Sequence, residues 1–255
     1  MPILSKRKLY TNVAAYAPAA AAAYTAQGVR FDGAANLQTE VGLTGSPVDA
    51  KVGMFSCWFK MMGNDGGYNV MLEGDGGTLC LSIYRWVDNK IRIVGADAGG
   101  TAVLDMYSTS TYMVGMGWKH ILASWDLSAA RAQLYVSDVD DRAGSPTLTN
   151  TNIDYTSLNW AIGTRFGGAL GLNAEVADFY VNFATSLDIS NSTNRRKFIT
   201  AGLAPVDLGS DGSTPTGTAP IIYLHGAVAS WHTNDGAGGG FTLTGTLTAA
   251  GSNPP

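Results

Sequence analysis

The sequence predicts an all-β protein, a two-sheet antiparallel jelly-roll sandwich. Three observations predict this class. Short segments of alternating apolar and polar residues recur about every ten residues, and turn residues separate them. Charged residues make up 14% of the chain, too few to line the wet faces of long amphipathic helices. Glycine supplies 32 of the 255 residues, which favours a chain rich in turns.

Residues 1–27 are predicted to form an extended arm. Lys6-Arg7-Lys8 and the Ala-rich stretch after it resemble a signal peptide, but Thr11, Asn12 and Pro18 interrupt the apolar run. An arm of this composition cannot form a core of its own. We expect it to order against neighbouring subunits.

Residues 28–255 are predicted to form one jelly-roll domain, because neither a fixed-period repeat nor a linker divides them. Residues 185–220 are loop-rich, with one short helical turn expected at Asn194–Thr200, and residues 221–255 carry late strands and a tail. The predicted strands span Val52–Met62, Tyr68–Glu73, Thr78–Trp86, Lys90–Val94, Thr101–Tyr107, Trp118–Asp126, Ala132–Val136, Ser157–Gly163, Glu175–Phe183, Ile221–Leu224 and Phe241–Leu247.

The early strands are justified by alternation and by the turns between them. Val52–Met62 places three apolar side chains on one face: Phe55, Cys57 and Phe59. The segment Gly63–Gly67 after it is a turn, as is Gly74–Gly77. Thr78–Trp86 alternates between Leu79, Leu81 and Ile83 on one face and Cys80, Ser82 and Tyr84 on the other.

The later strands show the clearest pattern. In Trp118–Asp126, one face carries Ile121, Ala123 and Trp125, and a loop then leads into Ala132–Val136 as a hairpin. In Glu175–Phe183, alternation places Ala177, Phe179, Val181 and Phe183 opposite Val176, Asp178, Tyr180 and Asn182.

Cys57 and Cys80 are too few for a disulfide scaffold. Both fall within predicted strands, so two separate buried or semi-buried thiols are the default expectation. A disulfide between adjacent strands stays open as the alternative.

Three ordered motifs resemble the laminin-G-like, or concanavalin A-like, jelly-roll superfamily over residues 28–185. The motifs are Val29–Gly33 leading into Phe55–Lys60, then Trp118–Asp126 with Leu134–Val136, then Ala161–Gly163 followed by Glu175–Tyr180. The tail is similar to jelly-roll virion proteins of tailed bacteriophages, through Arg195–Phe198, Pro205–Gly209, Ile221–Leu224 and Gly238–Phe241.

No catalytic constellation is predicted. Hydrolases of the superfamily set acids on alternate residues of one strand, whereas Glu175 and Asp178 are three apart and are expected on opposite faces. The chain has no Gly-x-Ser-x-Gly elbow, and His120 is expected to be a hydrogen-bonded histidine within a sheet. His225 and His232 lack a nearby cysteine for zinc.

Two ligand classes remain open at the loops and strand ends. Many laminin-G-like domains bind calcium at a rim, for which the candidates are Asp138, Asp140 and Asp141, or Asp207 and Asp211; turn formation is the alternative role of these aspartates. A glycan would stack on exposed aromatic rings beside polar groups, and the candidates are Tyr84, Trp86, Asp88 and Asn89. Packing is the alternative role of the two aromatic residues.

The leading functional hypothesis is a non-enzymatic structural subunit of a phage-like virion, a capsid decoration or tail accessory protein. It would contact other virion proteins and copies of itself as a homo-oligomer, and be made in the host cytoplasm. The alternative is a glycan-binding module on the virion or secreted, and a glycoside hydrolase ranks last. With a net charge of -4, the sequence indicates no nucleic-acid partner. No apolar run is long enough to indicate a membrane span.

Overall fold

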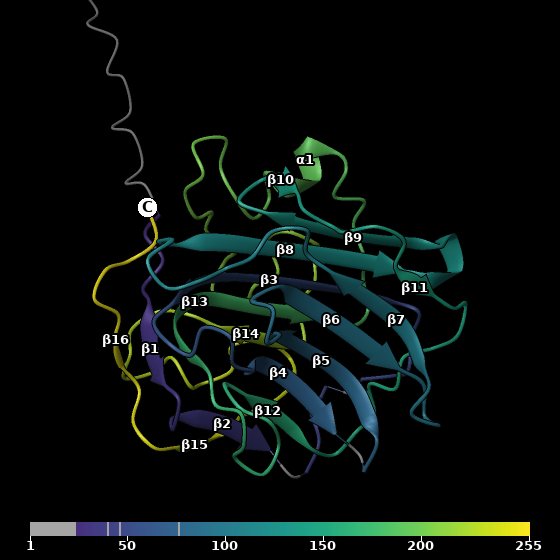
Figure 1. Cartoon of the computed structure of the whole chain (residues 1–255), viewed down its shortest axis with the longest axis horizontal. Helices are drawn as coiled ribbons and strands as arrows, with labels where there is room; N and C mark the ends of the chain where they lie inside the picture. The colour runs from purple at the N-terminus through teal and green to yellow at the C-terminus, as the bar shows by residue number, and fades with distance from the viewer. Residues whose placement is uncertain (1–23, 40, 46, 76) are drawn as a thin grey trace, which may run out of the picture.

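The computed structural model describes residues 24–39, 41–45, 47–75 and 77–255, and it shows two antiparallel sheets packed face to face (Figure 1). This confirms the predicted all-β sandwich. The only helical elements among these residues are the short α1 (Ser192–Arg195) and the 3-10 turn η1 (Leu127–Ala129). No helix in the described ranges has the length and apolar character needed to span a membrane.

Sheet A contains eight strands. Its order across the sheet is β10 (Val139–Asp140), β9 (Arg131–Val136), β8 (Lys119–Asp126), β3 (Val52–Met61), β13 (Asn173–Asn182), β1 (Val29–Asp32) and β16 (Thr248–Ala249), with β14 (Ile222–Leu224) also paired to β13.

Sheet B also contains eight strands. Its order is β11 (Thr147–Leu148), β7 (Ala102–Tyr107), β6 (Ile91–Ala96), β5 (Leu79–Arg85), β4 (Asn69–Asp75), β12 (Trp160–Ile162), β2 (Asn36–Thr39) and β15 (Thr242–Thr244). Four strands in sequence, β4 to β7, lie side by side in this sheet as a meander, and they occupy the front of Figure 1.

The core between the sheets is built from the predicted inward faces. Ile121, Ala123 and Trp125 of β8 all belong to it, as the alternation predicts. The Trp125 indole N–H donates to the Tyr155 hydroxyl at 2.9 Å, so the buried ring keeps no unsatisfied donor. Across the ladder, Trp125 faces Gly53, which has no side chain to displace the indole.

A bulge in β13 corrects the predicted faces of that strand. The register against β3 shifts between Ala177 and Tyr180, and Asp178 has the left-handed φ of 47°. Val176 therefore points into the core while Ala177 packs on the outer side, the reverse of the prediction. Phe179, Val181 and Phe183 lie together on the inward side, in line with the predicted alternation.

The same bulge overturns the argument that Glu175 and Asp178 point to opposite faces. Glu175 binds Lys60 at 2.7 Å on the outer side of sheet A. Asp178 accepts a hydrogen bond from Tyr24, which packs on that same side. The extra residue of the bulge brings both carboxylates to one face.

The loop-rich segment 185–220 covers the outer face of sheet A. Its buried side chains Ile189, Phe198 and Leu208 pack on outward residues of the sheet, namely Met54, Leu122, Tyr135, Tyr180 and Tyr223. The predicted helical turn exists but lies earlier, at α1, because the Asn191 side chain caps it by accepting the Thr193 amide. Sheet A is therefore buried on both sides, although its sequence alternates.

The described chain starts and ends side by side, at the left of Figure 1. Tyr24–Gln27 of the predicted arm run over sheet A, and the Gly28 amide donates to the Asn253 side chain. Residues 1–23 of that arm lie outside the described residues. Cys57 and Cys80 are both buried and no disulfide joins them, in line with the default expectation.

Candidate functional site

The outer face of sheet B carries a cluster of aromatic side chains. Tyr84 points away from the core, opposite Leu81 and Ile83, and Tyr68 stacks on it with ring centroids 4.7 Å apart. The Trp86 ring meets Tyr68 edge to face, also at 4.7 Å. Stacked and edge-to-face contacts hold rings in fixed orientations, so this cluster is a rigid platform.

A small cavity opens beside the platform. It has a volume of about 240 Å³, and five side chains line it: Trp86, Asp88, Lys90, Arg92 and Tyr107. The strand register explains their convergence, because Tyr84 pairs with Arg92 and Arg92 pairs with Tyr107 across β5, β6 and β7. Drug-sized ligands occupy roughly 300–1,000 Å³, so this cavity suits one small unit.

Charged groups of the cavity are held in place by their neighbours. The Arg92 guanidinium donates to both carboxylate oxygens of Asp105, which raises the pKa of Arg92. The same guanidinium lies 5.8 Å from the centre of the Trp86 ring, and the Lys90 ammonium lies 5.5 Å from that of Tyr107. The cavity thus combines aromatic faces with oriented donors and acceptors.

The structure separates the four residues predicted to contact a glycan. Trp86 and Asp88 line the cavity. Tyr84 is only 4% exposed and lies beneath Tyr68 and Trp86, so it supports the platform. Asn89 turns away from the cavity and accepts the Gly66 amide.

Sequence reasoning missed Lys90, Arg92 and Tyr107 of the cavity, and the Asp105 partner. For Arg92, the alternation of apolar and polar residues in its strand does contain a signal. Arg92 lies between the core residues Ile91 and Ile93, so it had to point outward. The contact between Arg92 and Asp105 is diagonal across β6 and β7. It could be predicted only from the register of these two strands, which a single sequence does not give.

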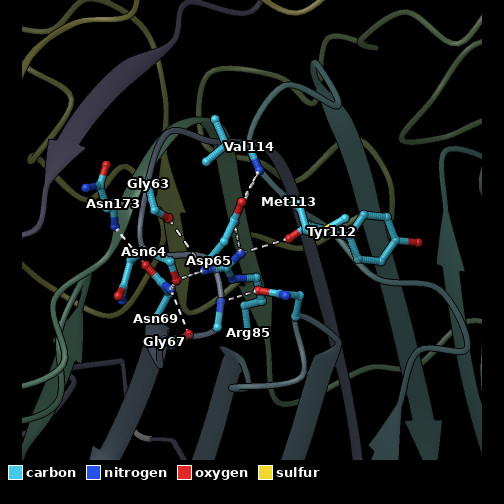
Figure 2. A network of polar contacts seen from close by, with 12 residues as sticks. Gly63, Asn64, Asp65, Gly67, Asn69, Arg85, Tyr112, Met113, Val114 and Asn173 are labelled. Carbon is cyan, nitrogen blue, oxygen red and sulfur yellow. Dashed lines mark hydrogen bonds and ion pairs between the residues drawn. The ribbon is translucent and has the colours of Figure 1, made fainter.

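A buried arginine positions the hairpin that carries Trp86 and Asp88. Arg85 is fully buried at the end of β5, where it binds Asp65 at 2.7 Å and donates to the carbonyl groups of Gly63, Asn64 and Tyr112 (Figure 2). Asn89 extends this network, since its carbonyl accepts the Tyr112 amide. Figure 2 shows the guanidinium at the centre, with the loops 63–67 and 112–114 around it.

The aspartates considered for calcium have protein partners. Asp138 pairs with Arg195 and Arg196, and Asp141 accepts from Ser110 and Tyr112. The other three accept backbone amides two residues ahead, as turn aspartates do: Asp140, Asp207 and Asp211. In the described ranges no cluster of three or more His, Cys, Asp or Glu side chains could hold a metal ion.

His120 lies within the sheet and bonds to Ser56 at 2.8 Å, as expected of a sheet histidine. Burial lowers its pKa to about 3, so the imidazole is neutral at physiological pH. Both side chains are at most 2% exposed. Because of this burial, a substrate could not reach the Ser56–His120 pair in the structure as it stands.

No family model matches the chain, and no curated protein matches its sequence. Several solved structures do resemble its three-dimensional structure. A candidate carbohydrate binding protein from Bacteroides ovatus is similar over 91% of this chain, with 9% sequence identity and a TM-score of 0.63; the chain spans 62% of that protein's length. A heptameric SAP-like pentraxin from Limulus polyphemus is similar over 90% of this chain and 97% of its own, with 13% identity and a TM-score of 0.55.

Domains LG4-5 of the mouse laminin alpha1 chain are more distantly similar, with 16% identity and a TM-score of 0.43 over 66% of this chain and 44% of theirs. The Bacteroides ovatus and Limulus polyphemus structures, with TM-scores above 0.5 but identities of 9% and 13%, show the fold alone, and the function has to be argued from the site. The fold is a jelly roll of the concanavalin A-like type.

Proposed function

We propose that the protein binds carbohydrate at the Trp86–Tyr107 cavity on the outer face of sheet B. One observation carries the proposal: two aromatic side chains line the same small cavity as Arg92, whose guanidinium is held in orientation by Asp105. A sugar ring has apolar C–H faces and a rim of hydroxyl groups. Aromatic walls accept the faces, and fixed charged groups bond the hydroxyls.

The covering of the two sheets supports this location. The outer face of sheet A is occupied by the segment 185–220, whereas the cavity on sheet B is open. The ion pair is also formed before a ligand arrives, so binding does not have to order the guanidinium. The Bacteroides ovatus protein with this fold is named for carbohydrate binding, which agrees with the proposal.

The proposed activity is binding without catalysis. Glu175 is neutralised by Lys60 and Asp178 is covered by Tyr24, so neither carboxylate is presented to a substrate as an acid or base. A role as a phage-like virion subunit, in contact with other virion proteins and copies of itself, stays a prediction from the sequence. A glycan-binding module serves equally on a virion or as a secreted protein.

Replacing Trp86 by Ala is expected to weaken saccharide binding at least tenfold, or about 1.4 kcal/mol, because it removes one wall of the cavity. A glycan array with the full-length chain identifies the ligand, and calorimetry with that glycan measures the affinity. Tyr107→Ala removes the opposite wall and should weaken binding similarly.

Trp118→Ala provides the matched control. Trp118 is a partly exposed tryptophan beside the C-terminal tail, on the other side of the sandwich, and its loss should leave the affinity unchanged. Binding that survives both cavity substitutions, or an array on which no saccharide binds, would contradict the proposed function.

A further inference from the structure

The first described residues form a strap across the bulge of β13. The strap, Tyr24–Gly28, is fixed at three points. The Tyr24 hydroxyl donates to the Asp178 carboxylate at 2.9 Å. Ala26 is fully buried against Trp58, Ala177 and Ile199. The Gly28 amide donates to Asn253 at 3.1 Å.

Asp178, the residue beneath the strap, has an unusual backbone conformation and environment for the middle of a strand. Asp178 adopts a left-handed conformation that non-glycine residues rarely take, and Asp and Asn tolerate it best. Its side chain is 3% exposed, and its second carboxylate oxygen has no hydrogen-bond partner among the described residues. Strain and an unpaired buried acceptor at one residue point to a role beyond packing.

The surroundings of Asp178 disfavour its charge. The ionisable groups near it are Tyr24 on the strap, Tyr223 on β14, Asp207 in the covering segment and Cys57 on β3. None of the four is a cation, and none of the ion pairs in the described part of the chain includes Asp178. Burial raises the pKa of Asp178 to about 7, although the Tyr24 hydrogen bond opposes the rise.

We propose that the strap Tyr24–Gly28 is a pH-sensitive latch, closed over Asp178 while that side chain is protonated and released when the side chain ionises. Lifting Tyr24 admits water to the carboxylate, which a closed strap denies it. Protonation also turns the unpartnered oxygen into a donor. The Tyr223 hydroxyl, which is buried and lies close to both Tyr24 and Asp178, is an acceptor within electrostatic reach.

The direction of the pH dependence follows from linkage. In the open state Asp178 regains a pKa near the ordinary value of about 4, while in the closed state it binds its proton up to about pH 7. Opening therefore releases one proton between these limits. The open fraction rises on the order of tenfold per pH unit in that window and levels off above it. The strap is thus mostly closed in acid, and its open fraction is highest at and above neutral pH.

Hydrogen exchange of the peptide that contains residues 24–28 tests the latch in the full-length protein, at pH 5 to 8.5 and corrected for the intrinsic exchange rate. We expect the opening of this peptide to increase on the order of a hundredfold from pH 5 to 7, and to change little above 7.5. Asp178→Asn removes the titration and keeps the left-handed backbone, so its opening should stay low at every pH.

Tyr24→Phe keeps the ring but removes the hydrogen bond, and should raise opening while the pH dependence remains. Asp207→Asn is the matched control, since it removes a nearby exposed carboxylate and should leave a clear pH dependence. Wild-type opening that is independent of pH, or a slope that Asp178→Asn retains, would overturn the latch. Saccharide binding at the Trp86–Tyr107 cavity is measured separately, and its outcome does not bear on the latch.

Discussion

Replacing Arg85 by Met is expected to lower the free energy of unfolding by about 3–5 kcal/mol, the range found when one partner of a buried ion pair is removed. The fully buried guanidinium binds Asp65 and three carbonyl groups in two loops. Methionine retains much of the apolar stem but leaves those carbonyl groups without their donor. Urea unfolding monitored by tryptophan fluorescence measures the change.

The partner substitution Asp65→Asn separates the ion pair from the carbonyl contacts. Asp65 is 39% exposed, and in this variant the guanidinium keeps the carbonyl groups as acceptors. We therefore expect a cost of about half that of Arg85→Met. Equal costs for the two variants would show that the ion pair alone carries the network.

Arg92→Met is the surface control. Arg92 and Asp105 are 34% and 23% exposed, and such pairs contribute about 0–1 kcal/mol. A loss of stability equal to that of Arg85→Met would contradict the distinction between the two arginines.

Arg85→Met should also weaken saccharide binding, because Asn89 in the hairpin that carries Trp86 and Asp88 belongs to the Arg85 network. The set of glycans that the variant binds should not change.

Replacing Gly53 by Ala is expected to destabilise the fold by about 3 kcal/mol, although alanine suits a strand better than glycine does. A Cβ at this position would lie 2.4 Å from the Trp125 ring. The ring cannot move away easily, because it is fully buried and bonded to Tyr155. The resulting overpacking outweighs the gain in strand propensity.

A double-mutant cycle isolates this contact. Trp125→Phe shortens the ring that Gly53 accommodates, and alone costs about 1–3 kcal/mol because the Tyr155 hydroxyl loses its donor. In the Phe background, Gly53→Ala should cost less than about 1 kcal/mol. Additive costs in chemical unfolding would show that Gly53 is required for its backbone and not for the space it leaves.

The strands of the sandwich were predictable because their sequences alternate, even where the structure buries both faces of the strand. The alternation of Ile121, Ala123 and Trp125 placed all three in the core correctly. It failed at Ala177, where one extra residue in the bulge reversed the faces that precede it. A bulge depends on tertiary packing, here the burial of Asp178 beneath the strap, and period-2 patterns contain no trace of it.

The candidate site was predictable only in part, for a similar reason. Trp86 and Asp88 were found because a strand end followed by a turn marks a hairpin. Arg92 and Tyr107 join them through the register of three strands, which is fixed by long-range pairing. The covering of sheet A by residues such as Phe198 was also beyond the sequence, since that segment has no periodic pattern.

The positions of the strap and of the cavity determine on which side of the molecule the proposed binding site opens. The strap crosses the outer side of sheet A, and the Trp86–Tyr107 cavity opens on the outer side of sheet B. The cavity therefore opens on the side of the molecule opposite to the strap. Several copies attached through their strap sides would present their cavities in one direction, and if each cavity binds saccharide as proposed, weak single contacts would then add up to strong binding.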